Sequence, residues 1–152
     1  MVALFIYLLA LVVWLGGMIG FVLFTAMLFS RLPVAEAGKV VSAIFPYYYL
    51  IGYVAGALGL ILAIYFAAAG RGRIWWICSA ILLAGALGIT VYAGAVIRPQ
   101  IEAVRSVAED TNPDPARKAQ FDALHKLSVQ LNGGVMVLDL LALLATAAAL
   151  SG

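Results

Sequence analysis

The pattern of apolar and polar positions divides the chain into four long hydrophobic segments. Residues 2–30, 40–70 and 74–97 contain no Asp, Glu, Lys, Arg or His. Each is longer than the ~20 residues that a helix needs to cross about 30 Å of hydrocarbon. A fourth segment, residues 121–151, is apolar on most sides but carries a stripe of polar residues. The pattern predicts an all-α fold, an integral membrane four-helix bundle.

We expect a single transmembrane domain over residues 1–152, with spans near residues 2–30, 42–69, 74–98 and 117–150. Between the third and fourth spans, apolar residues at helical spacing from Ile101 to Ala108 predict a short amphipathic helical segment. The chain is 66% hydrophobic and 11% charged, which is more apolar than the surface of a soluble monomer tolerates. The lipid bilayer is therefore its expected solvent.

Two prolines and one short connection refine this outline. Residues 70–73 form too short a link for anything but antiparallel neighbouring helices. Pro46 suits either the first turn of the second helix or a kink within it. The Arg98-Pro99 pair predicts that the third helix bends or leaves the membrane there.

The basic residues predict the orientation. Seven of the nine lie on the side of the first and third loops: Arg31, Lys39, Arg98, Arg105, Arg117, Lys118 and Lys126. Because cytoplasmic loops carry an excess of Lys and Arg, we expect residues 31–39 and 98–120 in the cytoplasm, and a bacterial inner membrane as the location. Basic residues confined to short loops beside apolar spans do not indicate nucleic-acid binding.

The fourth segment carries a polar stripe along one face of its helix. At about 100° per residue, His125, Ser128, Asn132 and Asp139 fall within about one sixth of the circumference. Polar side chains that face lipid are costly, so this face should point into the bundle or an aqueous cavity. Two interpretations stay open. In the first, the polar residues form hydrogen bonds that hold helices together, and His125 lies at the membrane interface. In the second, the stripe is a functional polar site.

Asp139 lies deepest in the predicted membrane and would be the costliest group if ionised. It is expected to be protonated, or paired with a donor on the third helix such as Thr90 or Tyr92.

Candidate metal chemistry depends on His125, since it is the only histidine, and Cys78 is the only cysteine. A haem iron could take His125 with a Met or Lys as second axial ligand. Copper could use His, Met and Cys together. No ligand pair has diagnostic spacing, and no nucleophile–base motif is present, which favours a non-enzymatic protein.

Two pairs of glycines have the spacing of membrane packing motifs, Gly16 with Gly20 and Gly52 with Gly56. Small residues four apart allow helix backbones to approach closely in lipid. Either pair could pack within one bundle or join two copies in a homo-oligomer.

Several short motifs together resemble one known family. They are Trp14-Leu-Gly-Gly17, the Phe-rich run over residues 21–29, Leu32-Pro33, Ala37-Gly38, Phe45-Pro46 with three tyrosines, Ile97-Arg-Pro-Gln-Ile101, and residues 121–132. The combination resembles the four-helix membrane family related to transmembrane protein 205, classed as a domain of unknown function. The resemblance implies one constellation of residues: Trp14, Arg31, Glu36, Tyr48, Arg98, Pro99, His125, Ser128 and Asn132.

These observations lead to one functional hypothesis and two alternatives. We expect a protein that binds or helps to move a small solute or metal ion at a polar site inside the bundle. His125 would be the proton-sensitive or ligand-binding group, Ser128 and Asn132 would line the cavity, and Arg31 or Arg98 would hold an anionic group. Arg31, Glu36, Arg98 and His125 would form a polar vestibule closed by tyrosines such as Tyr48. The alternatives are a haem- or metal-dependent oxidoreductase and a structural subunit of a membrane complex.

Overall fold

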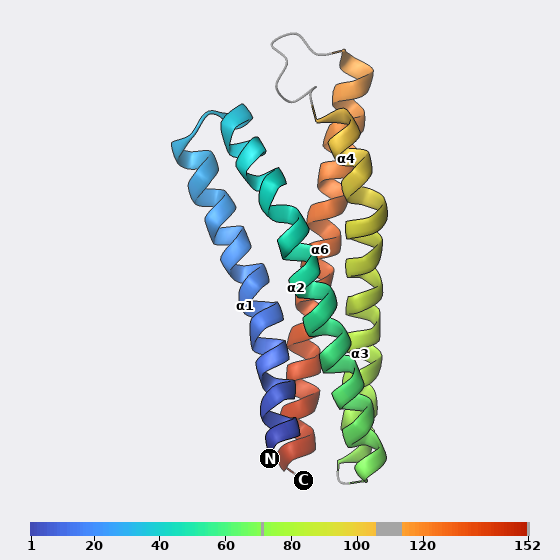
Figure 1. The fold of residues 1–152 in the computed structure, drawn as a ribbon. Coiled ribbons are helices and arrows are strands. Elements are labelled where there is room, and N and C mark those ends of the chain that lie inside the picture. Colours follow the sequence, from blue (N-terminus) through green and yellow to red (C-terminus); the bar gives the residue numbers. More distant parts are fainter. Residues whose placement is uncertain (71, 106–113, 152) are drawn as a thin grey trace.

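The computed structural model, which describes residues 1–70, 72–105 and 114–151, is built from long helices (Figure 1). Their bounds are α1 (Val2–Arg31), α2 (Val34–Ala69), α3 (Arg73–Tyr92), the π-helical turn η1 (Ala93–Ile97), α4 (Arg98–Val104) and α6 (Pro115–Ser151). Helices α3 and α4 continue one another through η1, so the bundle has four rods. The predicted all-α four-helix bundle is confirmed, with no strand in the described ranges.

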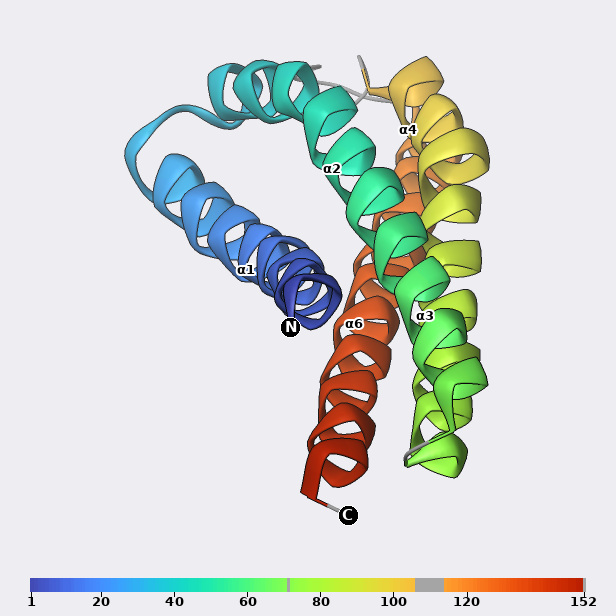
Figure 2. The same ribbon diagram turned by 60° about the horizontal axis from the view of Figure 1, so that its bottom comes forward.

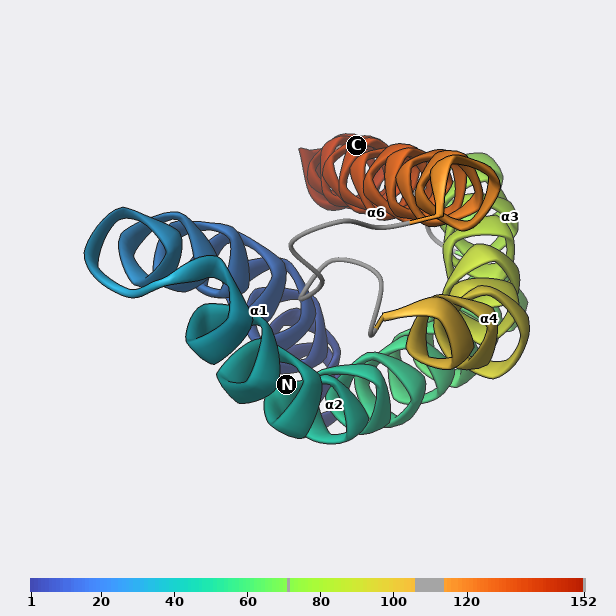
Figure 3. The same ribbon diagram turned by 90° about the horizontal axis from the view of Figure 1, so that it is seen from above.

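The four rods run alternately up and down, and both chain ends lie at the same end of the bundle (Figure 1). Seen from above, they form an open arc in the order α1, α2, α3 with α4, and α6 (Figure 3). Helix α1 lies beside α6 near the chain ends and diverges from it towards Arg31 (Figures 1 and 2). The rod that carries the polar stripe, α6, therefore packs along α3 over much of its length and meets α1 only near the termini.

The turn between α2 and α3 depends on two glycines with positive φ, Gly70 at 97° and Gly72 at 62°. The carbonyl of Gly72 accepts hydrogen bonds from the backbone N–H groups of Trp75 and Trp76 and so begins α3. A Cβ atom on Gly72 would also lie 2.6 Å from the carbonyl oxygen of Ala149. Glycine is required at position 72 because of its positive φ and because no Cβ atom fits there. The short turn makes α2 and α3 antiparallel neighbours, as expected.

The third rod continues through the Arg98-Pro99 pair, where the sequence predicts a bend or an exit from the membrane. Proline lacks an N–H and its ring collides with the carbonyl four residues earlier in an α-helix. The chain widens into the π-turn η1 directly before it, where the Arg98 N–H bonds to the carbonyl oxygen of Ala93. The extra residue absorbs the break in the hydrogen-bond ladder, and the rod continues to Val104. Ile101 to Val104 of the predicted amphipathic segment lie in α4; residues 106–113 are outside the described ranges.

Pro46 lies inside α2, about three turns after the helix begins at Val34. It is therefore not a first-turn proline, and α2 starts eight residues before the predicted span at residue 42. At 36 residues, α2 is about 54 Å long and extends well beyond the hydrocarbon.

Large apolar side chains cover the outside of all four rods. Phe5, Leu23, Ile61, Ile81 and Leu144 are each more than 60% exposed. Four helical stretches in the described residues are long and apolar enough to cross a membrane. Exposed apolar surface of this extent is stable only against lipid, which identifies a multi-pass membrane protein in contact with the bilayer.

Candidate functional site

The polar side chains of α6 lie on one inner face of the bundle. Ser128, Asn132, Asp139 and Thr146 follow one another at spacings of four, seven and seven residues. Three of them are buried, with exposed fractions of 8% for Ser128, 2% for Asp139 and 1% for Thr146. From Ser128 to Thr146 this inner stripe is about 27 Å long, close to the thickness of the hydrocarbon. We call these four residues the α6 stripe.

The upper part of the α6 stripe is bonded to α2. The Tyr48 hydroxyl donates to Asn132 Oδ1 at 2.7 Å, and Asn132 Nδ2 donates to the Ser128 carbonyl oxygen at 2.8 Å. The buried Tyr49 also interacts with the side chains of Ser128 and Asn132. This layer brings Tyr48, Ser128 and Asn132 together in one hydrogen-bonded group, and their role as a binding site stays a prediction.

Aromatic rings surround this layer. The ring of Tyr48 lies 4.6 Å from that of Phe21 on α1 and 5.3 Å from that of Tyr49, measured between centroids. Tyr49 stacks in turn on Tyr53, at 6.2 Å. A Cβ atom on Gly94 of η1 would collide with the Tyr53 hydroxyl and lie 2.8 Å from Tyr49 Cδ1. Glycine in the π-turn thus lets two tyrosines of α2 approach the backbone of the third rod.

Asp139 occupies the middle of the α6 stripe. Both of its carboxyl oxygens are buried, and neither has a hydrogen-bond partner among the described residues. The expected pairing with the third helix is wrong: the Thr90 hydroxyl donates to the Ala86 carbonyl oxygen, and Tyr92 is 46% exposed. The Asp139 carboxyl is close enough to interact electrostatically with the hydroxyls of Tyr7 and Tyr48.

The lower part of the α6 stripe belongs to a buried cluster of hydroxyl groups. The Tyr7 hydroxyl lies 2.7 Å from Ser79 Oγ and 2.7 Å from Thr146 Oγ1. Thr146 also donates to the carbonyl oxygen of Ala142 at 2.8 Å. The cluster joins α1, α3 and α6. Sequence analysis missed it, although Thr146 lies seven residues after Asp139 and so shares its helical face.

Trp14 packs in the middle of the bundle between α1 and α2. It is 3% exposed. A Cβ atom on Gly56 would lie 2.6 Å from Trp14 Cη2, and one on Gly52 would lie 3.2 Å from Trp14 Nε1. The pair Gly52 and Gly56 is therefore buried within the chain under Trp14, where a second copy cannot reach it. Gly16 and Gly20 are exposed, with open space beside them.

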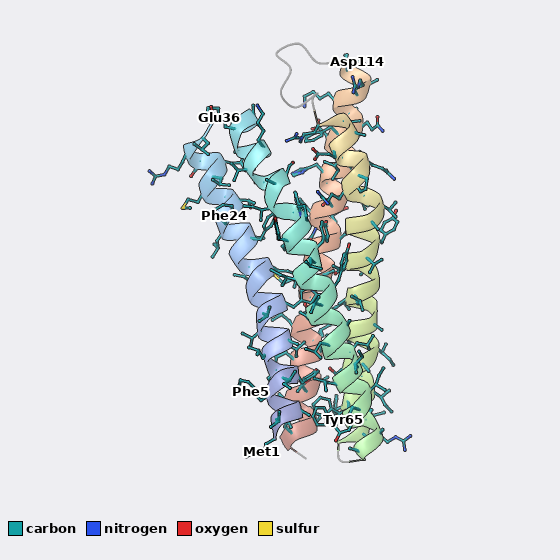
Figure 4. The ribbon with its side chains drawn as sticks, in the orientation of Figure 1. Met1, Phe5, Phe24, Glu36, Tyr65 and Asp114 are labelled. Atoms are coloured by element: carbon teal, nitrogen blue, oxygen red, sulfur yellow. The ribbon has the colours of Figure 1, made fainter. Side chains whose placement is uncertain are left out.

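The charged residues of the predicted vestibule lie at the end of the bundle away from the termini. Figure 4 places Glu36 at the α1–α2 turn and Asp114 at the start of α6, both far from Met1. Arg31, Glu36 and His125 are exposed, and no hydrogen bond or ion pair joins them in the described residues. Arg98 is half-buried and interacts with Tyr49 and Tyr53. The vestibule remains a prediction. Of its four residues, Arg98 is the one that lies near the tyrosines.

His125 lies above the buried part of the α6 stripe. Its ring stacks on Phe121, with centroids 6.0 Å apart. The part of the chain that the structure describes contains no group of three His, Cys, Asp or Glu side chains placed to hold a metal ion. The geometry therefore favours Asp139 over His125 as the central residue of the candidate site.

The family described as Domain of unknown function (DUF4149) matches residues 9–110. The chain belongs to this family. The match covers α1 from residue 9 onwards, α2 and the third rod through α4, so it contains Trp14, Ser79 and the tyrosines of α2. Tyr7 and α6 lie outside it. Comparison with curated proteins and with solved structures found no match.

Proposed function

We propose that this membrane protein binds a small solute or ion at Asp139 and helps to move it across the bilayer along the α6 stripe. The observation that carries the proposal is a carboxyl group that is 2% exposed and unpartnered within the described residues. Ionisable groups inside a membrane are rare and expensive, and they mark substrate and ion pathways and proton relays.

Polar side chains on both sides of Asp139 support a solute pathway through the bundle rather than a single buried carboxyl group. Towards the vestibule end lie the Tyr48 and Asn132 side chains, and towards the chain ends lies the cluster of Tyr7, Ser79 and Thr146. Hydroxyl and amide groups on both sides of Asp139 give a solute or a water molecule successive hydrogen-bonding partners. These groups extend the α6 stripe over about the thickness of the hydrocarbon.

Residues at the vestibule end are assigned a supporting role. Arg98, half-buried beside Tyr49 and Tyr53, is assigned to hold an anionic group or a carboxylate partner at this entrance. Arg31, Glu36 and His125 are assigned to the same entrance. The seven basic residues on this side favour a cytoplasmic position for it in a bacterial inner membrane. We also propose that the chain is related to the transmembrane protein 205 family, as the shared motifs suggest.

Flux through proteoliposomes tests the proposal. The purified chain is reconstituted, and gradients of protons, sodium, potassium and methylammonium are followed for wild type, Asp139→Asn and Asp122→Asn. Asp122 is an exposed carboxylate paired with Lys118 at 2.9 Å, and serves as the control. We expect flux of at least one of these solutes, lost in Asp139→Asn and retained in Asp122→Asn. Equal flux in wild type and Asp139→Asn, or none in either, would contradict the proposal.

A structural subunit of a membrane complex is the second candidate. It is favoured by the direct contacts that hold the rods together, namely the buried cluster of Tyr7, Ser79 and Thr146 and the packing of Trp14 on Gly52 and Gly56. The exposed Gly16 and Gly20 offer a surface for a partner helix or a second copy. This candidate predicts that Gly16→Leu abolishes co-purification with a partner while Asp139→Asn leaves it unchanged.

A further inference from the structure

We infer that the ion bound at Asp139 is a proton, and that in the closed bundle Asp139 is a neutral carboxylic acid. The inference rests on the proposed function for the pathway but makes a separate claim about the group that is exchanged. It is carried by three independent features of the molecule, namely the lack of hydrogen-bond partners, the absence of a counter-charge and the apolar layer around the carboxyl.

The first feature is the environment of the two carboxyl oxygens. Both are buried without a hydrogen-bond partner in the described residues. An ionised carboxylate in such a place would lose its hydration with nothing in return, whereas a neutral acid loses only the hydration of a polar group. The difference in cost strongly favours the protonated form.

The second feature is the absence of a cation at the level of Asp139. There is no Lys, Arg or His in residues 2–30 of α1, residues 40–69 of α2 or residues 74–97 of the third rod. On α6 itself the nearest is Lys126, about 20 Å away along the helix axis. No side chain in the sequence can therefore neutralise an Asp139 carboxylate by pairing with it inside the membrane.

The third feature is the layer of side chains level with Asp139. Tyr7 contacts Thr146, and α1 runs antiparallel to α6, so Trp14 lies at the level of Asp139. A Cβ atom on Gly85 would lie 3.6 Å from Leu138 Cδ1, which brings Ala86 of α3 to the same level. Hard metal ions take six or more oxygen ligands. The side chains of Trp14 and Ala86 offer no oxygen ligand beside Asp139, which suits a proton, since a proton needs no further ligand.

The ionisable groups that face Asp139 are two tyrosines, one on each side. Tyr7 comes from α1 and Tyr48 from α2, and α3 has no ionisable residue between Cys78 and Tyr92. In the exchange step the O–H bond of the acid breaks and the proton passes to a water molecule admitted to the pathway, which becomes a hydronium ion. The carboxylate remains until another hydronium ion returns a proton to it and becomes water. The hydroxyl groups of the two tyrosines can hold such a water on either side.

Infrared spectroscopy of the reconstituted chain at neutral pH tests the inference directly. The C=O stretch of a carboxylic acid lies apart from that of a carboxylate, and aspartate labelled with ¹³C at its carboxyl group shifts it. We expect an acid C=O band in wild type that moves with the label and is absent from Asp139→Asn. It should be retained in Asp122→Asn, because that exposed carboxylate is paired with Lys118.

The wild-type spectrum alone decides the question if Asp139→Asn fails to fold. Absence of any label-sensitive acid band in wild type at neutral pH would overturn the inference. The result also separates the two proposals. An acid band without flux in proteoliposomes supports proton binding and removes the transport proposal. Flux that depends on Asp139 without an acid band keeps the transport proposal and removes the proton.

Discussion

Trp14 lies over Gly56 so closely that a methyl group on Gly56 would stand 2.6 Å from Cη2 and 2.7 Å from Cζ3 of the indole ring. The indole belongs to α1 and the glycine to α2, and their contact sets how closely these two rods approach. It also fixes Trp14 at the level of Asp139, in the middle of the bundle. The Gly52 and Gly56 motif thus provides the space in which the Trp14 side chain packs.

Gly56→Ala should destabilise the bundle by about 1–3 kcal/mol, because the added methyl group forces Trp14 out of its position. Gly16→Ala is the matched control, since nothing lies within 4 Å of its Cβ position, and it should change stability by no more than about 0.5 kcal/mol. Unfolding in mild detergent, followed by circular dichroism, measures both. Equal stability of the two variants would show that the indole is not held there.

Tyr7→Phe should lower the free energy of unfolding by about 0.6–1.7 kcal/mol, which are the average and the largest contribution of hydrogen bonds between membrane helices. The variant leaves the hydroxyls of Ser79 and Thr146 without their shared partner. Tyr65→Phe is the control, because Tyr65 is 58% exposed. The same unfolding measurement applies. If the two substitutions have the same effect, the cluster does not hold the three rods together.

Gly94→Ala should destabilise the upper part of the bundle by about 1–3 kcal/mol, because its methyl group would collide with Tyr49 and Tyr53. Gly88→Ala, on the same rod with open space around it, should be neutral or slightly stabilising. Protection of backbone amides in α2 from hydrogen exchange provides a local readout. Unchanged protection of α2 in Gly94→Ala would argue against the close approach of these tyrosines to η1.

Tyr48→Phe should lower flux through proteoliposomes about fivefold to tenfold, the effect of losing one hydrogen bond of ~1 kcal/mol along the pathway. The lost bond is the one from the Tyr48 hydroxyl to Asn132 Oδ1. Tyr47→Phe is the control on the next residue, which is 67% exposed. Initial rates at a fixed gradient give the comparison. A rate for Tyr48→Phe equal to that of Tyr47→Phe would exclude Tyr48 from the pathway.

The fold could be predicted from the sequence because uncharged segments longer than 20 residues have few alternatives in lipid. The polar face of α6 could also be predicted, since Ser128, Asn132 and Asp139 share it by helical spacing alone. The partners of these residues could not. Tyr7 and Ser79 are single polar residues in apolar segments, and only the packing of α1, α3 and α6 brings them to Thr146.

The missed features have physical reasons of the same kind. Pro99 predicts a bend or an exit from the membrane, but the sequence does not predict the π-turn at Ala93–Ile97 that accommodates this proline within a continuing rod. His125 has the helical angle of the α6 stripe and is exposed, and helical spacing alone leaves open whether it lies inside the bundle or at the interface. Helical spacing gives the direction of a side chain, whereas its burial depends on how far the neighbouring rods extend.

The most direct test of the account combines labelling and flux at Asp139. Dicyclohexylcarbodiimide is an apolar reagent that reacts with protonated carboxyl groups. Proteoliposomes treated with increasing amounts are assayed for flux, and the fraction of chains modified at Asp139 is measured by mass spectrometry. We predict that Asp139 is modified and that the fraction of flux lost equals the fraction of chains labelled there. Flux that persists when Asp139 is fully labelled, or labelling that leaves Asp139 untouched, would contradict the account.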